Sequence, residues 1–234
     1  MELFSFQIHF NRTDLDNILS SSEYDPNNLI DLLKRDFRKE LEADAGVWEH
    51  YTVGSHTLMV MRQFEKYFSK ERFPTSFGMG SFRFILAMHD IGVCAAIEEG
   101  AKVGIGVRDA KRVGQHRHTL IIVETVMCQL NFNKNEIDIA KALLSNDPIG
   151  SYIKNGNPTR DIVIKMATES GISVRDIFDL LLILYMVDAG SYTEDAGGMN
   201  SLDHLFVFNR DEMKMTFSSE IQCKINSLKK SLGS

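Results

Sequence analysis

Three strongly apolar stretches of this chain each carry an ionisable side chain where a packed core favours none. They are residues 53–61, which contain His56, residues 84–90, which end in His89 and Asp90, and residues 180–188, which end in Asp188. A carboxylate at the end of an apolar run cannot easily reach water, and burying it without a partner costs several kcal/mol. Buried groups of this kind are therefore paired with an opposite charge or bound to a metal ion.

Two imidazoles and two carboxylates are suitable ligands for a divalent metal ion. Adjacent side chains at a helix end diverge by about 100°, so His89 and Asp90 leave a wedge that one ion can occupy. We predict that His56, His89, Asp90 and Asp188 converge from three helices around one divalent cation, which is Mn, Mg, Fe or another transition metal. The alternative is a buried ion-pair network in which His56 and Asp188 satisfy each other without metal.

The bulk properties narrow the class of protein. A chain of 234 residues fits a single domain over residues 1–234, and 44% hydrophobic with 25% charged residues is an ordinary globular composition. The net charge of −6 argues against nucleic acid or an anionic membrane as the main partner, although it leaves local basic patches open. The expected partner is instead a small phosphorylated or nucleotide substrate.

The sequence also indicates the cellular compartment of the protein. The first ten residues lack a basic segment followed by a continuous apolar core, so they do not form a signal peptide. No segment approaches the ~20 apolar residues that span a bilayer. The three cysteines are widely spaced and form no CxxC pair, which favours reduced thiols. A cytoplasmic location is expected, and a protein exported without a signal would have the same features.

Apolar periodicity predicts a mainly helical fold with a small β-sheet formed near the two termini. Residues 92–114 are punctuated by five glycines and are predicted to form a long loop with one helical turn. Alternating apolar residues predict strands at about 3–10 and within 204–217, packed on the helical core, with a hairpin turn at 209–212. Helices are predicted at about 26–44, 52–67, 81–91, 118–130, 134–144, 158–169, 173–189 and 218–232.

The motifs resemble those of a known superfamily. A histidine borne by a helix, then the sequence His89-Asp90-Ile91-Gly92, then a distant aspartate is the order found in the HD superfamily of metal-dependent phosphohydrolases. The stretch from His50 to Leu58 is similar to the start of the HD domain in bacterial uridylyltransferase/uridylyl-removing enzymes. The resemblance covers about residues 48–190 and implies a helical HD bundle over that range.

If the resemblance extends to activity, it implies hydrolysis of a nucleotide-type phosphomonoester or phosphodiester by a metal-activated water. His89 and Asp90 would act at the reaction centre, with Lys111 as a catalytic cation. The chain has no counterpart of the Gly-Ser and Asp-x-Asp signature of nucleotidyltransferases, so uridylylation does not carry over. It also lacks the Gly-Tyr-Pro signature of cyclic-di-GMP phosphodiesterases and the His-Asp-x-x-Glu-Asp arrangement of alarmone hydrolases.

One position departs from the superfamily. Where its members often have lysine after His-Asp-Ile-Gly, this chain has Val93. Either another cation serves the phosphate, or phosphate handling is altered. The candidate cations lie in the glycine-punctuated stretch, where a solvated loop is the alternative interpretation. They are Lys102, Arg108, Lys111 and Arg112.

Further residues are predicted around the same site. His116 and His118 are candidates for a second metal or for substrate, and the alternative is a pair of surface histidines. Asp147 is a candidate ligand or general base, although Asn146 to Gly150 has the composition of an ordinary turn. His50 and Tyr192 are predicted at the rim of the site, with helix-start packing and a plain polar loop as their alternatives.

Two other functional classes remain open. The first is a non-catalytic HD module that binds a nucleotide with a structural metal, which Val93 favours. The second is a di-iron HD oxygenase, which requires a complete second-metal set and depends on His116 and His118.

Overall fold

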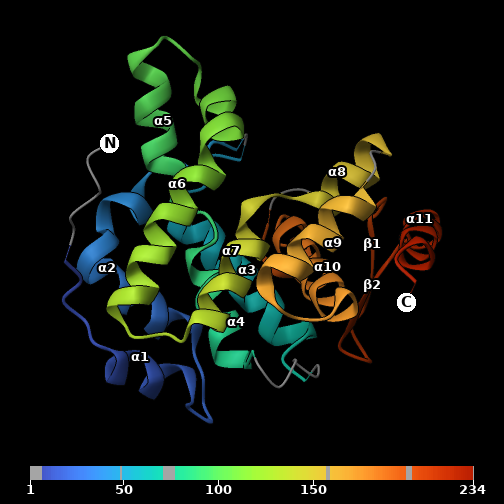
Figure 1. The fold of residues 1–234 in the computed structure, drawn as a ribbon, viewed down its shortest axis with the longest axis horizontal. Coiled ribbons are helices and arrows are strands. Elements are labelled where there is room, and N and C mark those ends of the chain that lie inside the picture. Colours follow the sequence, from blue (N-terminus) through green and yellow to red (C-terminus); the bar gives the residue numbers. More distant parts are fainter. Residues whose placement is uncertain (1–6, 48, 71–76, 157–158, 199–201, 234) are drawn as a thin grey trace.

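A computed structural model describes residues 7–47, 49–70, 77–156, 159–198 and 202–233 of the chain (Figure 1). The fold is mainly helical with one small two-stranded sheet, which confirms the predicted fold class. The elements are α1 (Arg12–Leu19), α2 (Pro26–Glu42), α3 (Val53–Tyr67), α4 (Met79–Met88), α5 (Val93–Lys102), α6 (Val107–Gln129), α7 (Lys134–Ser145), α8 (Pro148–Asn155), α9 (Thr159–Ser170), α10 (Val174–Gly190), the 3-10 turn η1 (Glu194–Ala196), β1 (Phe206–Asn209), β2 (Lys214–Phe217) and α11 (Ser219–Ser231).

Short polar side chains mark the starts of several helices. The Thr52 side chain accepts a hydrogen bond from the backbone of Ser55 at the start of α3, and Ser173 caps α10 in the same way. Asn133 and Glu136 form a capping box at α7. These caps lie where the sequence predicts helices from about 52, 134 and 173, and the structure confirms all three.

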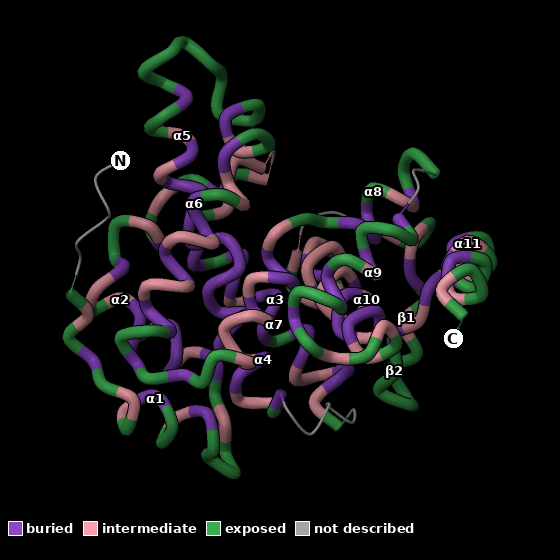
Figure 2. The backbone as a smooth tube through the Cα atoms, viewed as in Figure 1, coloured by how far each residue is buried: buried purple, intermediate pink, exposed green. Residues whose placement is uncertain are grey.

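The helices α3, α4 and α10 form the centre of the fold. Helix α3 packs against α2, α4 and α10, and seven of the ten residues of α4 are buried. Figure 2 shows how the buried residues are distributed along the chain. A helix that is apolar on all sides belongs in a core. Residues 79–102, which cover α4 and α5, are long and apolar enough to cross a membrane by length and composition, but 78% of the apolar window is buried inside the protein. The packing of the core therefore accounts for this apolar stretch.

The predicted loop at 92–114 is wrong, because α5 and the first two turns of α6 occupy most of it. Two of its glycines are sites of close helix packing and not turns. A Cβ atom on Gly100 would lie 2.3 Å from the Cβ of Ala110, and one on Gly114 would lie 3.1 Å from the Cβ of Ala96. The glycines allow α5 and α6 to approach closely as a helical hairpin, which projects from the body of the molecule (Figure 1).

The predicted turn at 146–150 is also partly helical, because Asp147 caps α8 and Pro148 occupies its first turn. A further helix that the sequence analysis did not predict, α1, begins after Asn11, whose side chain forms a capping box with Asp14.

The two predicted strands have different outcomes. The C-terminal hairpin is confirmed: β1 pairs antiparallel with β2, with Phe206 opposite Phe217. Of the predicted strand at 3–10, residues 3–6 lie outside the described residues, and residues 7–10 form no strand. The reason is local, because Phe10 anchors in the core and the following Asn11 starts a helix.

Candidate metal centre

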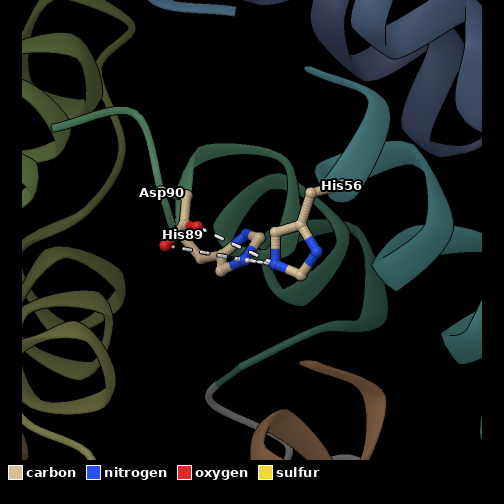
Figure 3. Close-up of side chains that lie close together, drawn as sticks. All are labelled: His56, His89 and Asp90. Atoms are coloured by element: carbon tan, nitrogen blue, oxygen red, sulfur yellow. Dashed lines mark hydrogen bonds and ion pairs between the residues drawn. The ribbon is translucent and has the colours of Figure 1, made fainter. Parts of the chain in front are cut away.

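His56 enters the core from α3. The helix begins after Thr52, so His56 lies one turn inside it, on the face that packs toward α4 and α10. Its side chain is almost completely buried. The Nδ1 atom lies 3.4 Å from the hydroxyl oxygen of Ser191, which leaves Nε2 directed toward the other members of the site (Figure 3).

His89 and Asp90 lie in the turn between α4 and α5, and both are buried. Gly92 holds this turn against α6, because its backbone N–H donates to the hydroxyl of Thr119 over 3.1 Å. A Cβ atom on Gly92 would lie 2.2 Å from the backbone nitrogen of Thr119 and 2.8 Å from the carbonyl oxygen of Gln115. The glycine of the His-Asp-Ile-Gly motif is therefore required by this contact with α6.

His56, His89 and Asp90 form one compact group (Figure 3). Their ligand atoms all lie within 4.8 Å of one another, and the two histidine Nε2 atoms are 3.4 Å apart. Asp90 Oδ2 is 3.8 Å from His56 Nε2, and Asp90 Oδ1 is 3.8 Å from His89 Nε2. This buried group can hold a metal ion.

Asp188 approaches the same group from near the end of α10. Its Oδ1 atom lies 2.9 Å from His56 Nε2 and 3.7 Å from His89 Nε2. Unlike the other three side chains, that of Asp188 is 46% exposed. All four residues that the sequence predicts as ligands therefore converge, and Asp188 lies on the open side.

The donor geometry fits a divalent ion. The Nδ1 atom of His89 lies 2.7 Å from the carbonyl oxygen of Leu86, so the neutral ring carries its proton there and presents the Nε2 lone pair to the site. Two nitrogens bound at about 2.0–2.1 Å to one tetrahedral ion lie about 3.3 Å apart. The observed 3.4 Å between the His56 and His89 Nε2 atoms matches this spacing.

The charges of the site are strongly coupled. Burial alone would lower the pKa of His89, but the carboxylates of Asp90 and Asp188 raise it to about 9. Burial alone would raise the pKa of Asp90, yet His89, Lys111 and His56 hold it below its ordinary value. Asp188 is only partly buried, and its hydrogen bonds with the two histidines outweigh that burial and hold its pKa well below the ordinary value.

Two side chains of α6 hold Asp90. The Nζ atom of Lys111 lies 3.5 Å from Asp90 Oδ2 and donates to the carbonyl oxygen of Ala45 over 2.8 Å. The side-chain amide of Gln115, one turn along α6, donates to Asp90 Oδ1. Gln115 was not predicted, because the i, i+4 spacing of Lys111 and Gln115 has meaning only on a helix and this segment was predicted as a loop.

Lys111 is the predicted cation that reaches the site. Val93, at the position where the superfamily often has lysine, is completely buried in the core and cannot contact a phosphate. Lys102 and Arg108 are exposed at the tip of the α5–α6 hairpin, and Arg112 is 79% exposed and pairs with Asp109. Among the described residues, none of these three is recorded in contact with the metal group.

A pocket opens beside the metal group, and the empty space in it, together with open solvent at its mouth, is about 490 Å³. Its polar end contains His89, Asp90 and Asp188. The apolar part of the lining comes from α7, α8 and α10. Its residues are Leu143, Leu144, Pro148, Ile149, Leu181, Leu184 and Tyr185. A molecule with a polar and an apolar part can therefore occupy the pocket.

The residues predicted to bind a second metal or the substrate lie in two different parts of the structure. His116 lines the pocket, where its Nδ1 atom lies 3.0 Å from the carbonyl oxygen of Leu144. His118 contacts Glu99 of α5 through Nε2 over 2.8 Å. Asp147 lines the pocket and accepts a hydrogen bond from the backbone of Gly150. The structure thus places His116 and Asp147 beside the site and pairs His118 with α5.

The two predicted rim residues also differ. The ring of Tyr192 stacks on His56 with ring centroids 4.9 Å apart, so it covers one side of the metal group. His50 is exposed with φ of 59°, and its recorded hydrogen bond joins its backbone to Val47. Ser191, which the sequence analysis did not single out, lies beside Tyr192 and contacts His56.

No protein-family model, curated protein or solved structure matches this chain. The class of site is therefore defined by its own geometry, as a buried group of two histidines and one aspartate, with a second aspartate on its open side.

Proposed function

We propose that this protein is a metal-dependent phosphohydrolase with an HD-type helical core, acting on a nucleotide-type phosphomonoester or phosphodiester. The observation that supports the proposal is the convergence of His56, His89, Asp90 and Asp188, the last three of which line a pocket. A divalent ion in such a site polarises a phosphoryl oxygen and lowers the pKa of a water molecule that it binds.

The protein groups divide the work in this proposal. His56, His89 and Asp90 hold the ion on its buried side. Asp188 completes the ligand set on the side that faces the pocket, where its carboxylate also accepts a hydrogen bond from the attacking water. Tyr192 and Ser191 fix the ring of His56 and keep bulk water from that face.

Lys111 takes the part of the lysine that Val93 replaces. It reaches the site from α6 and not from the turn after His-Asp-Ile-Gly, and its ammonium lies beside Asp90. A negatively charged phosphoryl group bound next to Asp90 would therefore meet this cation, which neutralises the charge that develops during hydrolysis. Gln115 keeps Asp90 oriented when Lys111 turns toward the substrate.

The pocket wall suggests how the rest of the substrate binds. Leu143, Leu181, Leu184 and the ring of Tyr185 offer an apolar surface in the same pocket as the polar residues. The flat, weakly polar base of a nucleotide fits such a surface while its phosphate points to the metal group.

The second candidate function is a non-catalytic module that binds a nucleotide and a structural metal. The burial of Val93 and the engagement of Lys111 with Asp90 and Ala45 favour it, because the one predicted cation that reaches the site among the described residues is then held by other groups. In this case the chain would bind nucleotide in the same pocket without turnover.

The test is hydrolysis of bis(p-nitrophenyl) phosphate and a panel of nucleotides by the full chain with Mn²⁺. We expect turnover that is abolished in Asp90→Asn and reduced about 100-fold in Lys111→Gln, the usual scale for loss of one charge-stabilising group. Asp211→Asn, an exposed acidic position, is the control and should retain wild-type activity. Nucleotide binding without turnover of any substrate would instead support the non-catalytic module.

A further inference from the structure

The tip of the α5–α6 hairpin is unusually apolar for a solvent-exposed segment. Seven large apolar side chains are exposed among the described residues, and four of them fall between residues 103 and 113. Their exposed fractions are 70% for Val103, 41% for Ile105, 46% for Val107 and 74% for Val113. Single exposed apolar residues are common, but a concentration of them marks an interaction surface.

The shape of the segment presents these side chains to a partner. Helix α5 ends at Lys102 and α6 begins at Val107, so residues 103–106 form a short connection at the apex. The hairpin projects beyond the body of the molecule (Figure 1), and the residues of its apex are exposed (Figure 2). Gly104 has φ of +74°, a conformation that glycine adopts without strain, and allows the tight connection.

Positive charge surrounds the apolar apex. Residues 102–113 contain four basic side chains and a single acidic one, although the whole chain has a net charge of −6. Lys111 turns inward to Asp90, whereas Lys102, Arg108 and Arg112 are exposed. Lys102 and Arg108 flank the apex, and Arg112 lies about one helical turn farther back. The apex is thus apolar, and the exposed cations Lys102, Arg108 and Arg112 lie next to it.

The start of α6 adds a second feature that favours an anion. Its N-cap residue is Gly106, which provides no side-chain hydrogen bond to the first backbone N–H groups. These groups carry the positive end of the helix dipole and bind phosphate readily. Val107 and Arg108 are the first two residues of α6, so these groups adjoin the apolar apex.

We propose that the α5–α6 tip docks on the surface of an anionic phospholipid bilayer. In a bilayer, hydrocarbon lies beneath a layer of phosphate groups. The tip matches this order, because its apolar apex projects beyond its cationic side chains. Val103, Ile105 and Val107 enter the edge of the hydrocarbon, while Lys102, Arg108, Arg112 and the start of α6 contact the headgroups. Because the rest of the protein is acidic, repulsion from the same surface orients the molecule with its tip foremost.

This attachment is weak, reversible and sensitive to salt, since three small aliphatic side chains and three cations form it. The inference does not depend on the proposed function, because none of the side chains that would contact the bilayer is a proposed metal ligand. It refines the prediction from net charge, which argued against an anionic membrane as the main partner but left local basic patches open.

The experiment is co-sedimentation of the full chain with vesicles of pure phosphatidylcholine and with vesicles of equal parts phosphatidylcholine and phosphatidylglycerol. We expect binding to the anionic vesicles at low salt and at least about tenfold less to the neutral ones. The variant Val103→Ser, Ile105→Ser, Val107→Ser should lower binding to anionic vesicles by about tenfold or more. Lys102→Gln with Arg108→Gln should remove much of the difference between the two vesicle types.

The matched control is Ile162→Ser with Val207→Ser, which removes exposed apolar side chains of similar exposure on α9 and β1. It should bind anionic vesicles like the wild type. Val103→Glu alone changes the most exposed apex residue and tests the apex if the triple variant fails to fold. Failure of the wild type to bind anionic vesicles, or equal binding by tip and control variants, would overturn the proposal. A dimer that the tip variants dissociate would overturn it in favour of a second copy as partner.

Discussion

Two groups of histidines in this fold differ in what brings them together. His56 and His89 are 33 positions apart in the sequence, yet their Nε2 atoms are 3.4 Å apart and share the carboxylates of Asp90 and Asp188. His116 and His118 are two positions apart on α6, where side chains diverge by about 200°, and each contacts a different segment. Convergence of helices, and not closeness in sequence, creates the candidate metal site.

The largest expected effect is the loss of metal affinity when a residue of the candidate site, and not one of the His116 and His118 pair, is substituted. Asp90→Ala removes a carboxylate ligand from the buried side of the site, so we expect at least about 100-fold weaker binding of Mn²⁺ by calorimetry, more than the loss of an outer-shell partner costs. His118→Gln is the comparison and should leave the affinity unchanged, because His118 contacts Glu99. Equal losses in both variants would show that the second group also contributes to the site.

The pH dependence of metal binding tests the charge coupling. The pKa of His89 is raised to about 9, so an ion that binds its Nε2 atom at lower pH must displace a proton. As the pH falls from about 8 to about 6, we expect the Kd for Mn²⁺ to rise about tenfold for each pH unit. An affinity that stays constant over this range would contradict the assignment of His89 as a ligand.

The metal-free protein should show the opposite trend in stability. The folded-state pKa of His89 lies above its ordinary value of 6.5, so its contribution is fully present below pH 6.5 and is lost as the pH rises through about 9. Asp188 has a lowered pKa, so its contribution is present above its ordinary value of 3.8 and is lost as the pH falls toward its folded-state pKa. In thermal unfolding with a chelator, His89 and Asp188 should therefore stabilise the metal-free protein most between about pH 3.8 and pH 6.5.

The contact between the His-Asp turn and α6 should appear in the free energy of unfolding. In Gly92→Ala the new methyl group meets the backbone of α6, so we expect a loss of about 1–3 kcal/mol in denaturant unfolding. Gly78→Ala is the control, since a Cβ atom there has no neighbour within 4 Å. Its effect should stay within about 0.5 kcal/mol. Similar losses in the two variants would indicate that α6 can shift without cost.

The smallest expected effect on metal affinity comes from removing the Ser191 hydroxyl, which contacts His56 on the side away from the metal group. Ser191→Ala removes the hydroxyl that lies 3.4 Å from His56 Nδ1, and we expect about threefold to tenfold weaker Mn²⁺ binding. Ser227→Ala, whose hydroxyl contacts only the backbone of its own helix among the described residues, should bind like the wild type. An unchanged affinity in Ser191→Ala would remove Ser191 from the account of the site.

The four residues of the candidate metal site could be identified from the sequence because each of them interrupts or ends an apolar stretch. His56, His89, Asp90 and Asp188 could be identified without knowledge of contacts, since buried charge requires a partner. The helix that carries His56 could also be placed, because Thr52 is a strong local cap. The prediction of a mainly helical fold with a C-terminal hairpin depended on the same local signals.

The support around Asp90 could not be predicted, because its signal depends on packing. By composition Gly100 and Gly114 indicate a loop, whereas in the structure they allow two helices to approach closely. Once that segment was predicted as a loop, the shared helix face of Lys111 and Gln115 was hidden. Glycine has the same composition signal in a turn and at a helix contact, and only the tertiary neighbours distinguish the two.

The most direct test of the central claim is a crystal structure of the protein grown with Mn²⁺, with anomalous diffraction used to locate the ion. We predict one anomalous peak about 2.0–2.3 Å from ligand atoms of His56, His89 and Asp90, with Asp188 on its open side. A fully described site without such a peak, or a peak held by His116 or His118 alone, would contradict the claim that these helices converge to bind a metal ion.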